Sequence, residues 1–478
     1  MTLKDSISQV AGLRFVIEQT PILSAAGRRY LYATEWQSSA DALALIFNEL
    51  TDTEQIIATA QPDTMADIEH LICQTRDIEP TIDGLMSGTI LGDIEFFEIK
   101  SFALIVERLR PLVGQLHLAD IPSLAQVVDI LDPERSRVAA FHIYDLYNAE
   151  LAEVRAQLKQ LNSSSSDTFA VDGTRIVPTV APDSTAPDDA IAAQLYQRSL
   201  QLEDAVRKDL AFQLRPLARY IRQALVAVAQ LDIRIAKIRV AERLSLTQPV
   251  ITAESTSYTS LVNPQVADAL RLKGKQYQPV DISFEAYPTL ISGINMGGKT
   301  VCLKTLALAQ TLCQFGFYVP AAEAHIALVD QVMLVVDDNQ NELSGLSSFA
   351  GEMRQINDII HVIRRSSRTL VLIDELARTT NPVEGRAIVE AMLQLLADHR
   401  VPSLVSSHYD HIVTTARRLR IKGLRDTDTT SDVDHLDRYI DYSLVEVDSA
   451  DTPHEALRIA RLIGIDPDFI DLCQDKLI

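Results

Sequence analysis

The feature that most constrains the fold of this chain is the octapeptide GINMGGKT at residues 293–300. It fits the pattern G-x-x-x-x-G-K-[ST], and three of the chain's 17 glycines lie in it: Gly293, Gly297 and Gly298. Glycine lets the backbone turn sharply and lets its N–H groups approach phosphate oxygens without a Cβ in the way. The octapeptide therefore predicts a P-loop between a strand and a helix. In such a loop Lys299 reaches the β- and γ-phosphates of a nucleotide, and Thr300 binds Mg²⁺.

A second motif consists of the apolar run Leu370–Ile373 followed by two carboxylates, Asp374 and Glu375. A hydrophobic strand that ends in Asp-Glu is typical of a Walker B segment. In that role Asp374 holds Mg²⁺, and Glu375 orients and deprotonates the attacking water. After the next apolar run comes His408. Its place predicts a side chain beside the γ-phosphate that senses bound ATP.

From about residue 246 onward, short apolar runs alternate with helical stretches. The candidate strands are Thr289–Ser292, Val332–Val336, Leu370–Ile373 and Ser403–Ser406. Alternation of this kind predicts an α/β sheet with helices on its faces. We therefore expect a P-loop ATPase domain over residues 246–478.

The chain before this domain has helical patterns. Residues 1–135 predict a helical packing domain, and residues 136–245 predict long helices. The longest apolar stripe runs from Leu202 to Ile238 with a mean spacing of about 3.6 residues, so it predicts one long helix. Pro216 should kink or divide that helix. Residues 162–190 are rich in Ser, Thr and Pro and predict a mobile insert, with an isolated strand at residues 174–178.

The charge of the chain is strongly acidic, with 44 Lys and Arg against 65 Asp and Glu and a net charge of −21. Proteins that coat nucleic acid normally carry a basic footprint. Residues 1–100 contain 6 basic and 16 acidic side chains, whereas residues 201–300 contain 13 basic and 9 acidic ones. The basic side chains of the long helix predict either a solvated face or a nucleic-acid contact: Arg215, Arg219, Arg222, Arg234, Lys237, Arg239 and Arg243.

Targeting signals and membrane spans are not expected. No apolar run approaches the length of a bilayer span, and the first residues, MTLKDSISQV, contain no apolar signal region. The four cysteines are far apart with no C-x-x-C pair, which argues against a zinc site and a disulfide framework. A cytoplasmic protein is the expectation.

Four ordered segments resemble the ATPase domain of MutS proteins: GINMGGKT, LSGLSSFAGEM at 343–353, LVLIDELARTTNPVEG at 370–385 and SSHYD at 406–410. Residues 228–241 resemble the last lever helix of that family, and residues 455–466 resemble its C-terminal helical dimerisation element. The resemblance implies helical core and lever domains followed by a P-loop ATPase domain of the ABC type.

The resemblance also implies ATP and Mg²⁺ as ligands, and a dimer in which each ATP is sandwiched. The dimer is formed with a second copy of the chain or with a related chain. The implied nucleotide contacts are Gly293, Asn295, Gly297, Gly298, Lys299 and Thr300 from one subunit, and Ser347 and Ser348 from the other.

The chain departs from the family pattern in informative ways. Ile294 replaces the usual proline, and Ala377 and Thr379 replace glycines after the Walker B strand, which reduces backbone freedom there. About 250 residues precede the ATPase motifs, so we expect no separate mismatch-reading or connector domain. The nuclease module of one MutS branch is also not expected.

Three functions fit these patterns. The first is an ATPase of MutS type that acts on branched or damaged DNA rather than on simple mismatches. The second is an ATPase that remodels a protein client, such as a cobalamin-dependent aminomutase, and does not bind DNA. The third is an ABC or chromosome-maintenance ATPase, whose signature is echoed by residues 343–345 but not completed.

Overall fold

The computed structural model describes residues 1–164, 169–172, 175–178, 187–293, 298–336, 348–366, 368–378, 380–424, 440–448, 456–462 and 464–476. By its contacts the chain divides into two compact units. Unit 1 contains residues 1–21, 33–51 and 237–478, and unit 2 contains residues 22–32 and 52–236. The domain bounds expected from the sequence, 1–135, 136–245 and 246–478, stay an expectation.

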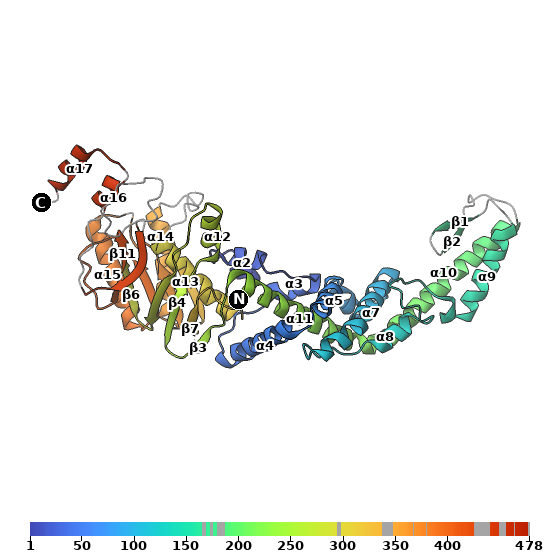
Figure 1. Cartoon of the computed structure of the whole chain (residues 1–478). Coiled ribbons are helices and arrows are strands. Elements are labelled where there is room, and N and C mark those ends of the chain that lie inside the picture. Colours follow the sequence, from blue (N-terminus) through green and yellow to red (C-terminus); the bar gives the residue numbers. More distant parts are fainter. Residues whose placement is uncertain are drawn as a thin grey trace. The chain divides into compact units, whose positions relative to one another are not determined.

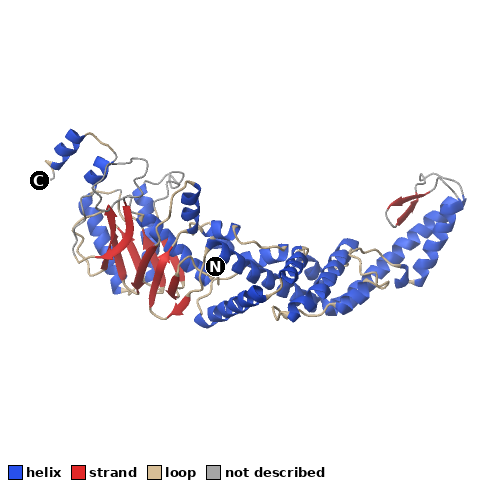
Figure 2. Cartoon of the chain, in the orientation of Figure 1, coloured by secondary structure: helices blue, strands red, loops and turns tan. Residues whose placement is uncertain are grey.

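Unit 1 contains a six-stranded sheet, whose strands are among the red arrows in Figure 2. Its order is β12 (Ile440–Glu446), β11 (Arg417–Leu424), β6 (Pro288–Ser292), β10 (Ser403–Ser406), β9 (Thr369–Ile373) and β8 (Gln331–Val335). All neighbouring strands are parallel except β11 and β12. The four strands expected from the sequence lie in this sheet, each within one residue of the expected ends. The prediction of an α/β sheet is therefore confirmed.

Helices cover this sheet, as Figure 1 shows for unit 1. Strand β9 is buried along its whole length. Its Val371 and Ile373 pack into one core with side chains of α14 (Ser348–Ile363) and α15 (Pro382–Asp398). Helix α13 (Lys299–Gln314) contacts β8 and β9 and is almost entirely buried. Because β6, β9 and β10 are parallel, their carboxyl ends meet at one edge of the sheet.

A second, four-stranded sheet in unit 1 has the order β3 (Val250–Thr252), β7 (Glu323–Ala327), β4 (Ser255–Leu261) and β5 (Val280–Glu285). The other helices that lie wholly in unit 1 are α1 (Leu3–Ser6), α2 (Leu13–Glu18), α12 (Pro264–Leu272), α16 (Ala456–Leu462) and α17 (Pro467–Gln474).

Unit 2 is built mainly from helices around one apolar core. They are α3 (Ala25–Tyr32), α5 (Pro62–Cys73), α6 (Glu79–Ser87), α7 (Asp93–Gln115), α8 (Ala125–Leu131), α9 (Ala149–Ser164) and α10 (Pro187–Leu214). Helices α4 (Ala40–Thr59) and α11 (Ala218–Leu244) have residues in both units. Within the described part of the chain, no helix is both long enough and apolar enough to cross a membrane.

The long apolar stripe forms two helices rather than one. Helix α10 ends at Leu214, a 3₁₀ turn follows at Arg215–Leu217, and α11 begins at Ala218. Pro216 lies inside this turn, where its ring and missing N–H interrupt the helical hydrogen bonds. The predicted division at Pro216 is confirmed, and the stripe is buried on both sides of it, as at Leu210 and Leu225.

The insert expected at residues 162–190 is described only in part. Strands β1 (Phe169–Asp172) and β2 (Arg175–Pro178) pair antiparallel. The expectation of an isolated strand at residues 174–178 is therefore wrong, because the strand has a partner from the same insert. Residues 165–168, 173–174 and 179–186 of the insert lie outside the described part of the chain, and the predicted mobility stays a prediction.

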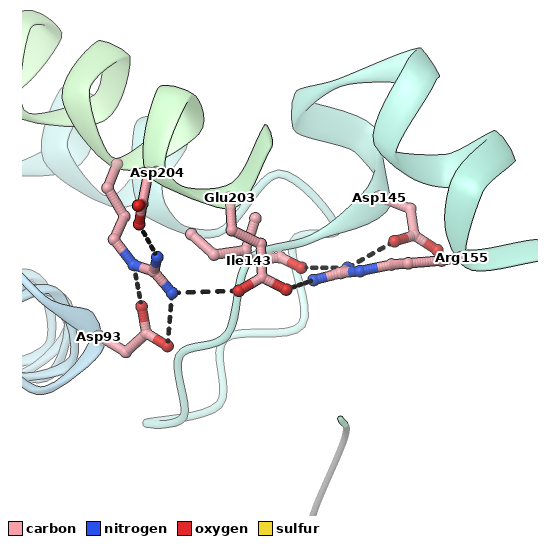
Figure 3. A network of polar contacts seen from close by, with 7 residues as sticks. Asp93, Ile143, Asp145, Arg155, Glu203 and Asp204 are labelled. Carbon is pink, nitrogen blue, oxygen red and sulfur yellow. Dashed lines mark hydrogen bonds and ion pairs between the residues drawn. The ribbon is translucent and has the colours of Figure 1, made fainter. Parts of the chain in front are cut away.

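Charged side chains of unit 2 pair with one another (Figure 3). Arg155 on α9 donates to Asp145 Oδ1 at 2.6 Å and to Glu203 Oε1 at 3.0 Å. The buried Glu203 on α10 also accepts from Arg207 Nη2 at 3.2 Å, and Arg207 binds Asp93 at the start of α7. This network links α7, α9 and α10.

Basic side chains of α11 also pair with groups of unit 2. Arg222 of α11 forms ion pairs with Glu79 and Asp83 of α6. Arg234 Nη2 donates to the carbonyl of Leu118 at 2.7 Å. These partners come from distant parts of the sequence and lie within unit 2. They favour a structural role for these arginines over the nucleic-acid contact considered above.

Candidate nucleotide site

The loop between β6 and α13 begins and ends in glycines with positive φ angles, 133° at Gly293 and 80° at Gly298. A side chain at either position is strained by the backbone alone. It would also be crowded, because a Cβ at Gly293 would lie 3.1 Å from the Cβ of Ile421. Residues 294–297, which include the predicted contacts Asn295 and Gly297, lie outside the described residues, so those two contacts stay predictions.

Lys299 is the first residue of α13, and its side chain is only 3% exposed. Its Nζ donates to the carbonyl of Gly293 at 2.8 Å and lies 3.7 Å from Glu375 Oε1. Burial lowers the pKa of Lys299, while the nearby carboxylates of Glu375 and Asp374 oppose that change. The amine thus lies between Gly293 and the end of β9, at the N-terminus of α13, where anions are favoured.

Thr300 and Asp374 are in direct contact, since Thr300 Oγ1 donates to Asp374 Oδ2 at 2.5 Å. A hydroxyl and a carboxylate side by side supply the hard oxygen ligands that Mg²⁺ prefers. Among the described residues, no cluster of three or more His, Cys, Asp or Glu side chains could hold a metal ion. Mg²⁺ prefers octahedral coordination by oxygen, so an ion held by this pair would need further oxygen ligands.

Ser406, the last residue of β10, connects the two carboxylate residues. Its hydroxyl donates to Asp374 Oδ1 at 2.6 Å and accepts from the backbone N–H of Glu375 at 2.8 Å. Glu375 also accepts a hydrogen bond from Arg378 at 3.1 Å. Sequence reasoning used Ser406 only to mark the end of a strand. The sequence signal that could have identified Ser406 is its place at the end of β10, because β10 and β9 are parallel neighbours and end at one edge of the sheet.

His408 follows β10, and its ring packs on that of Tyr409 with the centroids 4.2 Å apart. Its Nδ1 is buried and has no hydrogen-bond partner among the described residues. Burial lowers the pKa of His408, and the carboxylate of Glu375 acts in the opposite direction. The imidazole thus lies within electrostatic reach of Glu375 and Lys299. Its role as a sensor stays a prediction.

The side chains of the two serines expected to contact a second subunit lie outside the described part of the structure. Ser347 lies outside the described residues, as does Thr379. Ser348 begins α14, but its side chain is not among those described.

A cavity of about 910 Å³ adjoins Gly298 and Lys299. Tyr277 and Tyr442 line it, together with apolar side chains such as Val266 and Ile421. A volume of this size accommodates a small-molecule ligand. Tyr277 precedes β5 and Tyr442 lies on β12, outside all the motifs noted in the sequence. No sequence signal identified either residue.

Comparison with known proteins finds a family match over the residues around Lys299. Residues 289–477 match the family described as MutS domain V. An endonuclease MutS2 from Thermus thermophilus is 35% identical over 188 residues, which cover 39% of this chain and 24% of the relative. A DNA mismatch repair protein MutS from Caulobacter vibrioides is 31% identical over 239 residues, covering 48% of this chain and 26% of the relative. The chain thus spans about a quarter of the length of these relatives.

Proposed function

We propose that the chain is a MutS-type ATPase, because residues 289–477 match MutS domain V and two MutS relatives are more than 30% identical over 188 and 239 residues. It binds ATP with Mg²⁺ at the site around Lys299 and hydrolyses the bond to the γ-phosphate. The observation that carries this proposal is that an amine–carboxylate pair and a hydroxyl–carboxylate pair lie together at one edge of the sheet. Lys299 lies 3.7 Å from Glu375, and Thr300 contacts Asp374.

Each of these residues has a role that its position supports. Lys299 neutralises phosphate charge at the N-terminus of α13. Glu375 accepts the proton of the attacking water, and His408 contacts the γ-phosphate region with its unpartnered side of the ring. Thr300 and Asp374 hold Mg²⁺, which when bound neutralises charge that develops on the phosphate oxygens. The base and sugar occupy the cavity lined by Tyr277 and Tyr442.

The active form in this proposal is a dimer. Ser347 and Ser348 of one subunit complete the nucleotide site of the other, and helices α16 and α17 contribute to the dimer contact. Exposed apolar side chains on α17, Phe469 and Leu472, support such a contact. The second subunit is another copy of the chain or a related chain.

The proposed client is branched or damaged DNA rather than a simple mismatch. Two of the relatives, an endonuclease MutS2 and a DNA mismatch repair protein MutS, support DNA as the client. The hydrolysis cycle then drives a conformational change on that DNA.

Two substitutions test the ATPase. Lys299→Ala removes the amine that meets the phosphates, so it should abolish ATP binding. Glu375→Gln keeps a side chain of the same size without the base, so it should retain ATP binding and lower kcat by at least about a hundredfold. Equilibrium binding of ATP and steady-state release of phosphate measure the two effects. A Glu375→Gln variant with the wild-type turnover rules out Glu375 as the base and contradicts the proposal.

A further inference from the structure

The backbone of Ala377, two residues after Glu375, is held on both sides by side chains from other elements. Glu352 on α14 accepts a hydrogen bond from the N–H of Ala377, with its Oε1 at 2.5 Å. Tyr409, which follows β10, donates its hydroxyl to the carbonyl of Ala377 at 2.6 Å. Neither residue is among those assigned above to the nucleotide.

This turn needs outside support. The φ angles of Glu375 and Ala377 are 48° and 61°, so both residues are in the left-handed region. Residues with a Cβ avoid that region, and such conformations persist only where surrounding structure holds them. The hydrogen bonds of Ala377 with Glu352 and Tyr409 stabilise its conformation. The hydroxyl of Ser406 stabilises that of Glu375 by accepting from its N–H.

The position of Tyr409 is itself built into the fold. Helix α15 begins at Pro382 and is capped by Asn381, whose Oδ1 accepts from the N–H groups of Val383 and Glu384. The next residue, Gly385, faces the phenol. A Cβ at Gly385 would lie 2.1 Å from the Tyr409 hydroxyl oxygen. The absence of a side chain there leaves the space in which Tyr409 reaches Ala377.

We propose that Glu352 and Tyr409 are positioning residues for hydrolysis. By fixing both backbone polar groups of Ala377, they hold the left-handed turn that directs the Glu375 carboxylate to Lys299. This inference rests on the proposed function, because it concerns the residue assigned there as the base. Glu352 and Tyr409 then affect the rate of the chemical step and do not affect the affinity for ATP.

The test compares steady-state ATP hydrolysis by Glu352→Ala, Tyr409→Phe and the wild type. Loss of one supporting hydrogen bond should lower kcat about tenfold in each variant and leave the KM for ATP within about twofold. The double variant should lose less than the product of the two single effects, because both bonds hold the same turn. Glu352→Gln keeps an oxygen that can accept from Ala377, so it should recover most of the wild-type kcat.

Gln355→Ala is the matched control, because Gln355 is exposed on the same helix. It should keep the wild-type kcat and KM. Thermal unfolding of each variant identifies any that fail to fold. Tyr409→Phe and Glu352→Gln differ from the wild type by very few atoms, so we expect both to fold and their kcat values to be comparable with that of the wild type.

The outcomes separate this inference from the proposed function. If Glu375→Gln stops turnover while Glu352→Ala and Tyr409→Phe keep the wild-type kcat, the positioning role is wrong and the ATPase proposal stands. A raised KM with unchanged kcat also overturns the positioning role, because it indicates contact with the nucleotide. If turnover survives Glu375→Gln, the proposed function itself fails.

Discussion

The absence of a Cβ at Gly385 permits the observed position of the Tyr409 ring. An added Cβ would meet the Tyr409 hydroxyl and ring at 2.1 and 2.4 Å, so Gly385→Ala must displace that ring. We expect kcat to fall about as far as in Tyr409→Phe, roughly tenfold. Alanine is otherwise the better helix former by about 1 kcal/mol, so helix propensity cannot explain a loss. Steady-state kinetics and urea unfolding measure both effects.

The control for this substitution is Gly114→Ala in α7, where an added Cβ meets nothing within 4 Å. It should leave kcat unchanged and keep or slightly raise the free energy of unfolding. A Gly385→Ala variant that turns over ATP like the wild type contradicts the proposed role of Tyr409.

At this scale the sequence predicted the residues that lie inside short motifs. Lys299, Thr300, Asp374 and Glu375 meet at one edge of the sheet because strand–loop–helix motifs carry their own local geometry. The contacts of Glu352 and Tyr409 with Ala377 could not be predicted. They are made to backbone groups of a turn whose conformation exists only in the folded structure.

At the scale of elements, the C-terminal end of α13 is held by a lysine from α11. Lys237 is buried, and its Nζ donates to the carbonyls of Phe315 and Gly316 at 2.8 and 2.9 Å. The ring of Phe317 lies 4.4 Å from the same atom. Donors and positive charge at a helix C-terminus are stabilising. A side chain of α11 thus anchors the C-terminal end of α13.

Burial lowers the pKa of Lys237 to about 7, against about 10.4 in an unfolded chain. Between these two values the unfolded state binds more protons, so the free energy of unfolding should rise with pH. Relative to Lys237→Met, the wild type should gain up to about 1.4 kcal/mol per pH unit between pH 7 and 9. Below pH 7 the difference should be constant. Urea unfolding over this range measures it.

Lys208→Met is the matched control, because Lys208 is exposed on α10. It should follow the wild-type pH profile. A constant difference between the wild type and Lys237→Met from pH 7 to pH 9 contradicts the assignment of Lys237 as a buried, readily deprotonated group.

The elements themselves were largely predictable, because strands and helices follow from local periodicity and from proline. The four strands and the division at Pro216 are examples. The use of the basic helix face was not predictable. The partners of Arg222 and Arg234 lie more than a hundred residues away in the sequence, and charge patterns alone do not identify such partners.

At the scale of the whole molecule, the acidic balance and the internal pairing of arginines bear on the client. The net charge is −21, and several basic side chains of the long helices are engaged within unit 2. In the proposed function, a DNA contact must therefore come from other basic groups or from a surface that the proposed dimer forms. It should be strongest in the ATP-bound state, which the Glu375→Gln variant holds by retaining ATP without hydrolysis.

The most direct test of a DNA-acting ATPase is the affinity of Glu375→Gln with ATP and Mg²⁺ for branched, mismatched and perfect duplex DNA over a range of salt concentrations. We predict tightest binding to branched DNA, with the logarithm of the association constant falling linearly as the logarithm of salt concentration rises. Lys299→Ala is the matched control and should lose the ATP-dependent part of the binding. Absence of binding to all three DNAs at low salt contradicts DNA as the client and leaves the protein client as the alternative.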